Sequence, residues 1–185
     1  SEAICARGLS FKPVEAEGFR GGYYLNPRLP LDHNDFYFSD AGHDITVLAW
    51  ADFYNAGELT AYAGEEHYTT TPGLIAGLFL KEGPDFVKRV NGDFVIFILR
   101  PQHKEAYLFR DQVGILPVAY TVGREGFFFS SDIISLAKTF QETEPVDTEY
   151  LLPFFKYTDY RKTPSGRVKK LLPGHYVCFS EEKVK

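Results

Sequence analysis

The sequence predicts an α+β fold in which two stacked β-sheets are covered by helices on their outer faces, a four-layer α-β-β-α sandwich. Strand-like apolar segments outnumber helical ones, and the few helical segments stand between groups of strands. A sheet with one apolar face must bury that face, and a second sheet is a suitable partner. With 185 residues, 44% of them apolar, the chain is expected to form one domain spanning 1–185. The pattern alone leaves other α+β arrangements open.

The charge and cysteine content argue against several classes of function. A formal net charge of −5, with acidic and basic residues mixed along the chain, lacks the basic stripe that a nucleic acid or an anionic membrane would need. No apolar run reaches membrane-spanning length, and the amino terminus has no signal-peptide core. Cys5 and Cys178 show no C-x-x-C spacing, so we expect no disulfide framework, no zinc site and a cytoplasmic location.

The first part of the chain is expected to supply four strands. Ala3 to Phe11 alternates loosely, and Phe19 to Leu25 is rich in aromatic residues, with a Gly21-Gly22 pair that indicates a bulge. Asp35 to Ser39 has the character of an edge strand. Asp44 to Ala51 is a more continuous apolar run, typical of a buried strand.

Two helices are expected next. Asn55 stands at a cap position with Glu58 three residues later, which is the spacing of a helix start. Thr71 can cap a second helix over Pro72 to Lys81, because proline loses no hydrogen bond at the first helical position. Gly83 should end that helix.

The remaining segments are expected to form hairpins and short helices. Turns after Arg100 and Val122 separate four strands, which are Asp93 to Arg100, Glu105 to Arg110, Pro117 to Val122 and Gly126 to Ser130. Asp132 can cap a helix with one apolar face of Ile133, Ile134 and Leu136. The last three expected elements are a linker at Glu142 to Asp147, a helix from about Thr148, and a closing hairpin at Arg167 to Ser180 around Leu172-Pro173-Gly174.

Two segments carry a resemblance to a known family. They read Phe109-Arg110-Asp111-Gln112-Val113-Gly114-Ile115-Leu116-Pro117-Val118-Ala119-Tyr120 and Arg167-Val168-Lys169-Lys170-Leu171-Leu172-Pro173-Gly174-His175-Tyr176. They resemble the strand end R-D-x-x-G-x-x-P-L-Y-Y and the late segment K-x-L-x-P-G-H of the class II glutamine amidotransferase domain of the asparagine synthetase family. The match spans roughly Val47 to Ser180. It implies a sandwich of the N-terminal-nucleophile hydrolase type.

The nucleophile implied by this resemblance is a free amino-terminal cysteine whose own α-amine acts as the base. An amide nitrogen has no basic lone pair, so the cysteine must be the first residue. This sequence begins Ser1-Glu2-Ala3-Ile4, and Cys5 would serve only if these residues were removed as a propeptide. We favour the interpretation that Cys5 is an ordinary strand thiol.

The oxyanion hole implied by the resemblance is an Asn-Gly pair in N-G-E-I-Y-N at the end of a strand. Tyr54-Asn55 fixes the register here and places Trp50 and Ala51 at the two donor positions. Loss of a single oxyanion donor costs about 10²–10³ in rate. We interpret both positions as vestigial and expect Trp50 to fill the glutamine pocket from the end of its strand.

Two further positions correspond to substrate-binding residues of the family. Thr71 lies where relatives carry the aspartate of S-D-x-E that binds the glutamine amino group, and we interpret Thr71 as a helix cap. Arg28 is a candidate remnant of the arginine in H-R-R-L that binds the carboxylate, with a solvated loop arginine as an equal alternative. The family's H-R-G-P-D loop has no visible counterpart.

Other polar pairs have simpler interpretations. Asp32-His33 with Asp35, and His43-Asp44, have the residue types of metal ligands, but we favour solvated turns and expect no metal. Arg110-Asp111 is expected to form an internal ion pair or to shape a turn.

The sequence therefore favours a degenerate amidotransferase domain without glutaminase activity, kept as a scaffold or docking domain for an ATP-dependent amide-forming synthetase. The resemblance implies an ATP-pyrophosphatase-type synthetase domain in cis or in trans, with ATP and Mg²⁺ bound only there and no cofactor in this chain. The sequence also leaves open whether the chain forms a homodimer. One alternative is an active glutaminase that releases ammonia for asparagine synthesis from a processed Cys5. Another is a peptide- or amino-acid-binding module that uses the vestigial pocket.

Overall fold

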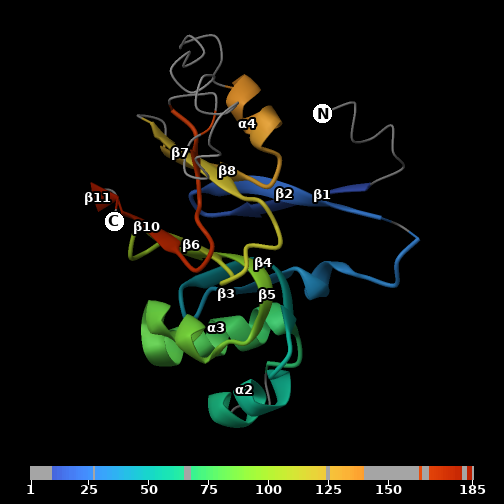
Figure 1. The fold of residues 1–185 in the computed structure, drawn as a ribbon. Coiled ribbons are helices and arrows are strands. Elements are labelled where there is room, and N and C mark those ends of the chain that lie inside the picture. Colours follow the sequence, from blue (N-terminus) through green and yellow to red (C-terminus); the bar gives the residue numbers. More distant parts are fainter. Residues whose placement is uncertain are drawn as a thin grey trace.

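The computed structural model describes residues 10–26, 28–64, 68–123, 126–139, 163, 167–180 and 183–184. Its larger sheet is antiparallel and has six strands in the order β11-β10-β6-β5-β4-β3 (Figure 1). These strands are β3 (Tyr37–Asp40), β4 (Ile45–Phe53), β5 (Gly92–Arg100), β6 (Glu105–Arg110), β10 (Tyr176–Ser180) and β11 (Lys183–Val184). The strands expected in the middle of the chain are confirmed, with ends displaced by a few residues.

Helices cover the outer face of this sheet. They are α2 (Ala56–Ala63), α3 (Thr71–Glu82) and the 3-10 helix η2 (Gly83–Arg89). The buried side of α3 packs on alternate residues of β4 and β5, such as Val47 and Ile96, which are fully buried. Phe86 of η2 is also fully buried, and its ring lies edge-on to Phe109 with 5.4 Å between centroids. The helix expected over Pro72 to Lys81 is therefore confirmed.

The ends of α3 have clear local causes. The hydroxyl of Thr70 accepts from the backbone N–H of Gly73 at 3.2 Å, so Thr70 is the cap and Thr71 is the first helical residue. The expectation that Thr71 caps this helix is wrong by one residue, because Pro72 is accommodated at the second helical position as well as at the first. Gly83 ends the helix with φ +61°, a conformation that glycine adopts without a steric cost.

The second layer of strands packs on the inner face of the six-stranded sheet. It consists of the hairpin β1 (Ser10–Ala16) and β2 (Phe19–Leu25), and of a three-stranded sheet in the order β8-β7-β9. Those three strands are β7 (Ala119–Gly123), β8 (Gly126–Ser130) and β9 (Lys169–Lys170). Phe97 of β5 lies between the two parts of this layer, with ring centroids 4.9 Å from Phe19 and 4.6 Å from Phe129.

The hairpin contains no bulge at Gly21 and Gly22, which corrects the sequence-based expectation. Its register is continuous, with Pro13 opposite Gly22 and Val14 opposite Gly21. A Cβ atom at Gly22 would collide with the carbonyl oxygen of Lys12 on the paired strand. The glycine therefore permits close approach of the two backbones in a regular ladder.

The fourth layer is α4 (Ile133–Thr139), which lies on the side of β7 and β8 away from the six-stranded sheet (Figure 1). Asp132 caps it as expected, since its carboxylate accepts from the backbone N–H groups of Ile134 and Ser135, both at 3.1 Å. Leu136 is buried, but Ile134 is 67% exposed. The expected apolar face was wrong at Ile134, because Ile133, Leu136 and Ala137 share the buried stripe at helical spacing.

The closing segment is a crossover between sheets and not the expected hairpin. Lys169 of β9 pairs with Tyr120 of β7, whereas Tyr176 of β10 pairs with Phe109 of β6. The turn at Leu172-Pro173-Gly174 carries the chain from one sheet to the other, and the N–H of Gly174 donates to the carbonyl of Asp111 at 2.7 Å.

Three expected elements lie wholly or mostly outside the described residues: the first strand up to Leu9, the linker at Glu142 to Asp147, and the helix near Thr148. None of the helices in the part that the structure describes is long and apolar enough to cross a membrane.

Candidate functional site

Trp50 lies inside β4, and not at the end of its strand. The strand continues to Phe53, and Trp50 pairs with Val95 of β5. Its side chain points to the inner face of the sheet, the same face as Leu48, which packs in the inter-sheet core. Two residues further along, Trp50 is 41% exposed. The expectation that its ring fills a pocket is therefore wrong in this structure, since burial on this face falls off between Leu48 and Trp50.

Ala51 faces the opposite side of the sheet. It is half-buried against the core beneath the helices and pairs with Phe94. Neighbouring residues of a strand point to opposite faces, so Trp50 and Ala51 present their side chains in opposite directions. Neither side chain carries an amide group that could donate to an oxyanion.

The other positions singled out from the sequence are dispersed. Thr71 lies at the first turn of α3 in the outer helical layer. Arg28 is exposed in a turn, where its backbone N–H donates to the side-chain oxygen of Asn26 at 3.1 Å. Cys5, with Ser1 to Ile4, lies outside the described residues. The described elements therefore do not gather Trp50, Thr71 and Arg28 into one site.

The Tyr54-Asn55 pair that fixed the register has structural contacts. The hydroxyl of Tyr54 donates to Asp93 at 2.6 Å. The Asn55 side chain donates to the carbonyl of Arg89 at 2.9 Å and accepts from the N–H of Asn91 at 3.0 Å. Asn55 stands at the start of α2 but makes no side-chain cap, which corrects the sequence-based expectation. Its amide instead joins α2 to the loop before β5.

Arg110 and Asp111 shape the turn after β6. The Arg110 guanidinium donates to the carbonyls of Leu171 at 2.6 Å and Gly114 at 2.7 Å. Asp111 is 1% exposed, and its carboxylate accepts from the N–H groups of Val113, at 2.8 Å, and Gly114. No salt bridge joins Arg110 to Asp111 among the described contacts, so the turn interpretation is confirmed. Burial lowers the pKa of Arg110, against the opposing effect of the Asp111 charge.

Asp32 and Asp35 form a capping box around the 3-10 helix η1 (His33–Asp35), in which each carboxylate accepts from a backbone N–H. His33 contacts the hydroxyl of Tyr23 at 2.5 Å. The two carboxylates therefore shape the turn. No group of three or more His, Cys, Asp or Glu in the described residues could hold a metal ion.

His43 and Asp44 belong to different interactions. His43 contacts Asp40 at 2.7 Å, while Asp44 accepts from His103 at 2.6 Å and from the N–H of Gln102 at 3.0 Å. Asp44 is only 8% exposed, so the expectation of a solvated turn is wrong for this residue. It ties the turn before β4 to the turn after β5.

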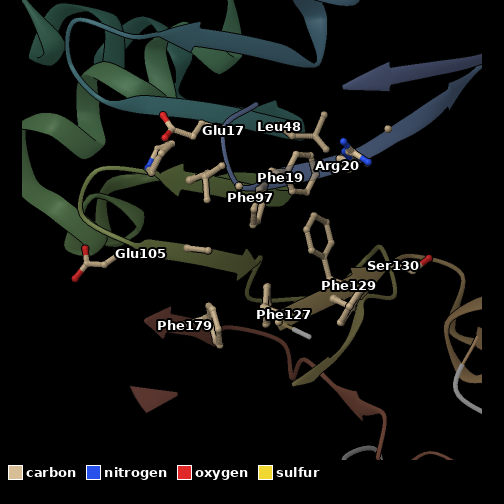
Figure 2. Close-up of a pocket in the computed structure, with 18 of the residues that line it drawn as sticks. Glu17, Phe19, Arg20, Leu48, Phe97, Glu105, Phe127, Phe129, Ser130 and Phe179 are labelled. Carbon is tan, nitrogen blue, oxygen red and sulfur yellow. The ribbon is translucent and has the colours of Figure 1, made fainter. Parts of the chain in front are cut away.

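A cleft of about 750 Å³ opens between β2, β8 and the inner face of the six-stranded sheet (Figure 2). Leu48, Phe97 and Leu99 lie on its sheet side, and Trp50 is not among the described lining residues. Sequence reasoning missed this cleft. The available signal was the apolar character of both faces of β5, where Phe97 and Leu99 alternate with Ile96 and Ile98 and so require partners on both sides.

Comparison with known proteins agrees with this architecture. The model of a family described as "Glutamine amidotransferase domain" matches residues 39–185. "Asparagine synthetase [glutamine-hydrolyzing] 2" of Bacillus subtilis (strain 168) is 32% identical over 101 residues, which cover 54% of this chain and 14% of that protein. The chain thus spans a small part of the length of this relative.

Solved structures support the fold at lower identity. A glutamine phosphoribosylpyrophosphate (PRPP) amidotransferase from B. subtilis complexed with ADP and GMP superposes with a TM-score of 0.53 and 14% identity, over 82% of this chain and 30% of that chain. A structure titled as the allosteric regulatory enzyme of purine biosynthesis gives a TM-score of 0.52 and 13% identity over the same shares. Because the family model covers most of the sequence and the four layers agree with it, the chain belongs to the class II glutamine amidotransferase domain family.

Proposed function

We propose that this domain, related to that of asparagine synthetases, does not hydrolyse glutamine and serves as a scaffold or docking domain for an ATP-dependent amide-forming synthetase. The observation that carries the proposal is the pair Trp50 and Ala51 in the middle of β4. The resemblance places the family's oxyanion donors at these positions. An exposed indole in place of the asparagine removes a pre-arranged side-chain donor to the developing negative charge, while Ala51 keeps only the backbone N–H that glycine would also supply.

The contrast between two sets of residues supports the same proposal. The family motifs that persist are occupied in packing and turns: Asn55 joins α2 to the loop before β5, and Arg110 joins β6 to the segment after β9. The positions that would carry chemistry are altered. Thr71, at the place of the amino-group aspartate, is a neutral residue of a helical turn that Thr70 caps. Retention of the first set alone is what a scaffold requires.

The length of the relative supports a partner for this domain. The matched region is 14% of the asparagine synthetase, whose remaining length is available for other activities. We propose that an ATP-pyrophosphatase-type synthetase domain, in cis or in trans, docks on this domain and alone binds ATP and Mg²⁺. We propose that this domain and the synthetase domain act in the cytoplasm. A homodimer of this domain is one further arrangement.

The test is release of ammonia and glutamate from glutamine by the purified chain with its natural amino terminus. A glutamine-hydrolysing asparagine synthetase is the positive control, and intact mass shows whether Ser1 to Ile4 are present. We expect release at the buffer rate and no labelling of Cys5 by a glutamine-analogue electrophile. Turnover that Cys5→Ala abolishes would overturn the proposal.

The second candidate is an active glutaminase with Cys5 exposed by processing. The similarity to a glutamine-hydrolysing asparagine synthetase is the observation that favours it. This candidate requires a mature chain that begins at Cys5, together with oxyanion donors from backbone N–H groups alone. A mass that includes Ser1 to Ile4, combined with absent turnover, would exclude it.

A further inference from the structure

The cleft between β2 and β8 meets both strands at their edges. Its lining includes the consecutive residues Phe19 to Gly22 of β2 and all of β8, Gly126 to Ser130. The side chains of successive strand residues point to opposite faces of a sheet. A cleft that contacts every residue of a strand therefore lies along the edge of that strand. In the described part of the chain, β2 pairs only with β1, and β8 pairs only with β7. Each strand therefore offers the cleft an edge of backbone donors and acceptors.

The floor of the cleft is aromatic. Phe19, Phe97 and Phe129 contact one another with centroids 4.6 to 6.3 Å apart, and Phe127 stacks on Phe179 at 5.7 Å (Figure 2). Phe97 is buried at 3% exposure, whereas the other four rings are half-buried. Partly exposed rings beside open strand edges can pack against apolar side chains of an added strand, which project toward the floor at every second residue.

The two ends of the cleft differ in charge. Glu17 lies at one end, and Arg20 lies toward the other (Figure 2). Lys104 and Glu105 also line the cleft, but Glu105 shares a sheet face with Tyr107, beneath the helices, so its carboxylate points away from the aromatic floor. Glu17 and Arg20 are exposed, and Glu105 accepts a hydrogen bond from Tyr107 at 2.9 Å. One end therefore favours a basic group and the other an acidic group.

We propose that this cleft binds a short extended peptide that adds as a strand along β2 or β8, with apolar side chains on the aromatic floor, a basic group at Glu17 and an acidic group at Arg20. Backbone hydrogen bonds to the strand edge supply sequence-independent affinity, while the floor and the two charged ends select the sequence. The site lies toward the β5–β6 turn, away from the altered positions Trp50 and Ala51. It is independent of whether the domain hydrolyses glutamine.

The test uses a blocked pentapeptide, acetyl-Lys-Phe-Thr-Phe-Glu-amide, because its two phenylalanines fall on one face of a strand. Binding is followed by NMR on the whole chain, with the methyl groups of Leu99 and Ala106 as reporters in the cleft. The single tryptophan gives an unambiguous indole signal from Trp50 outside the cleft. We expect saturable shifts, largest at the two methyl groups. Largest shifts at Trp50, or no shifts at millimolar peptide, would overturn the proposal.

Peptide and protein variants distinguish strand addition from non-specific hydrophobic binding. Acetyl-Lys-Phe-Pro-Phe-Glu-amide lacks the central backbone N–H and should bind more weakly. Acetyl-Gln-Phe-Thr-Phe-Gln-amide should bind about two- to fivefold more weakly for each charge pair lost. Arg20→Gln should weaken binding of the two peptides that carry glutamate and not of the glutamine peptide, while Arg28→Gln, at an exposed arginine that does not line the cleft, should change nothing. Equal binding of all three peptides would show that neither the edge nor the charges recognise the ligand, and the proposal would fail.

Discussion

The guanidinium of Arg110 donates to the carbonyl oxygen of Leu171 at 2.6 Å, and this contact joins the two sheets of the sandwich. Arg110 ends β6 of the six-stranded sheet, whereas Leu171 follows β9 of the smaller sheet and donates its own N–H to Val118. The same guanidinium holds the carbonyl of Gly114 at 2.7 Å. One half-buried side chain thus satisfies two carbonyls where the chain crosses between layers.

Removal of this guanidinium should destabilise the domain. Arg110→Met leaves both carbonyls without their donor, and we expect a loss of about 2–3 kcal/mol in unfolding free energy from urea titrations. Arg110→Lys keeps one donor direction and should lose about half as much. Arg28→Met is the matched control at an exposed arginine and should stay within about 0.5 kcal/mol. A loss below that value for Arg110→Met would contradict the inter-sheet role.

Gly114 should be sensitive to substitution for two separate reasons. Its φ is +73°, and a Cβ atom there would lie 2.7 Å from Cγ of Pro173 and 2.9 Å from the Arg110 guanidinium carbon. We expect Gly114→Ala to cost about 1–3 kcal/mol in thermal or urea unfolding. Gly57→Ala, in the first turn of α2 with no atom within 4 Å of the added methyl, should be neutral or stabilising by up to about 1 kcal/mol.

A double-mutant cycle checks the mechanism at Gly114. If the collision with Arg110 contributes, Gly114→Ala should cost less in the Arg110→Met background than in the natural protein. An unchanged cost would assign the effect to the backbone conformation together with the contact of the added Cβ atom with Pro173.

The sequence predicted the elements with strong local causes. The cap of α4 at Asp132, the end of α3 at Gly83 and the turn after β6 all depend on residues within a few positions of one another, and these predictions are confirmed. Asn55 shows the limit of such reasoning. Its amide has non-local partners at Arg89 and Asn91, which compete with the expected local cap and take its place.

Long-range placement was less predictable. The segment from Arg167 to Ser180 has the turn residues of a hairpin, yet its two strands join different sheets, because pairing partners are set by tertiary packing. The cleft was missed for the same reason, since its walls come from β2, β5 and β8, far apart in sequence. The exposure of Trp50 also depends on what the second layer covers, which no local pattern encodes.

The Asp44 carboxylate should make stability depend on pH. Burial raises its pKa, but hydrogen bonds from Gln102 and His103 and the charge of Arg100 outweigh burial and hold the pKa below its usual value. A lowered folded-state pKa gives stability that is complete above the unfolded-state value of about 3.9 and is lost as pH falls through the folded-state value. Asp44→Asn should therefore cost about 1–3 kcal/mol near pH 7 and progressively less below about pH 4.

Urea unfolding from pH 7 to pH 3 measures this difference. Asparagine also tolerates the φ of +52° at this position, so the backbone is a minor source of the effect. Asp85→Asn removes an exposed carboxylate paired with Lys88 and should change stability little at any pH. A gap between natural protein and Asp44→Asn that stays constant to pH 3 would refute the carboxylate as its source.

The double substitution Trp50→Asn with Ala51→Gly should restore the family's residues without restoring its chemistry. Trp50 is 41% exposed, so the cost should be far below the 3–5 kcal/mol typical of a buried tryptophan. Strand propensity and the added glycine together should cost about 1–2 kcal/mol in calorimetry. No ammonia should be released from glutamine while Ser1 to Ile4 precede Cys5, because the amide nitrogen of an internal cysteine has no basic lone pair. The measurable loss should instead be association with a synthetase domain, since an exposed aromatic ring contributes well to a protein interface. Ile134→Asn, at a more exposed apolar residue on α4, should leave that association intact. Equal weakening by both variants would remove Trp50 from the docking surface.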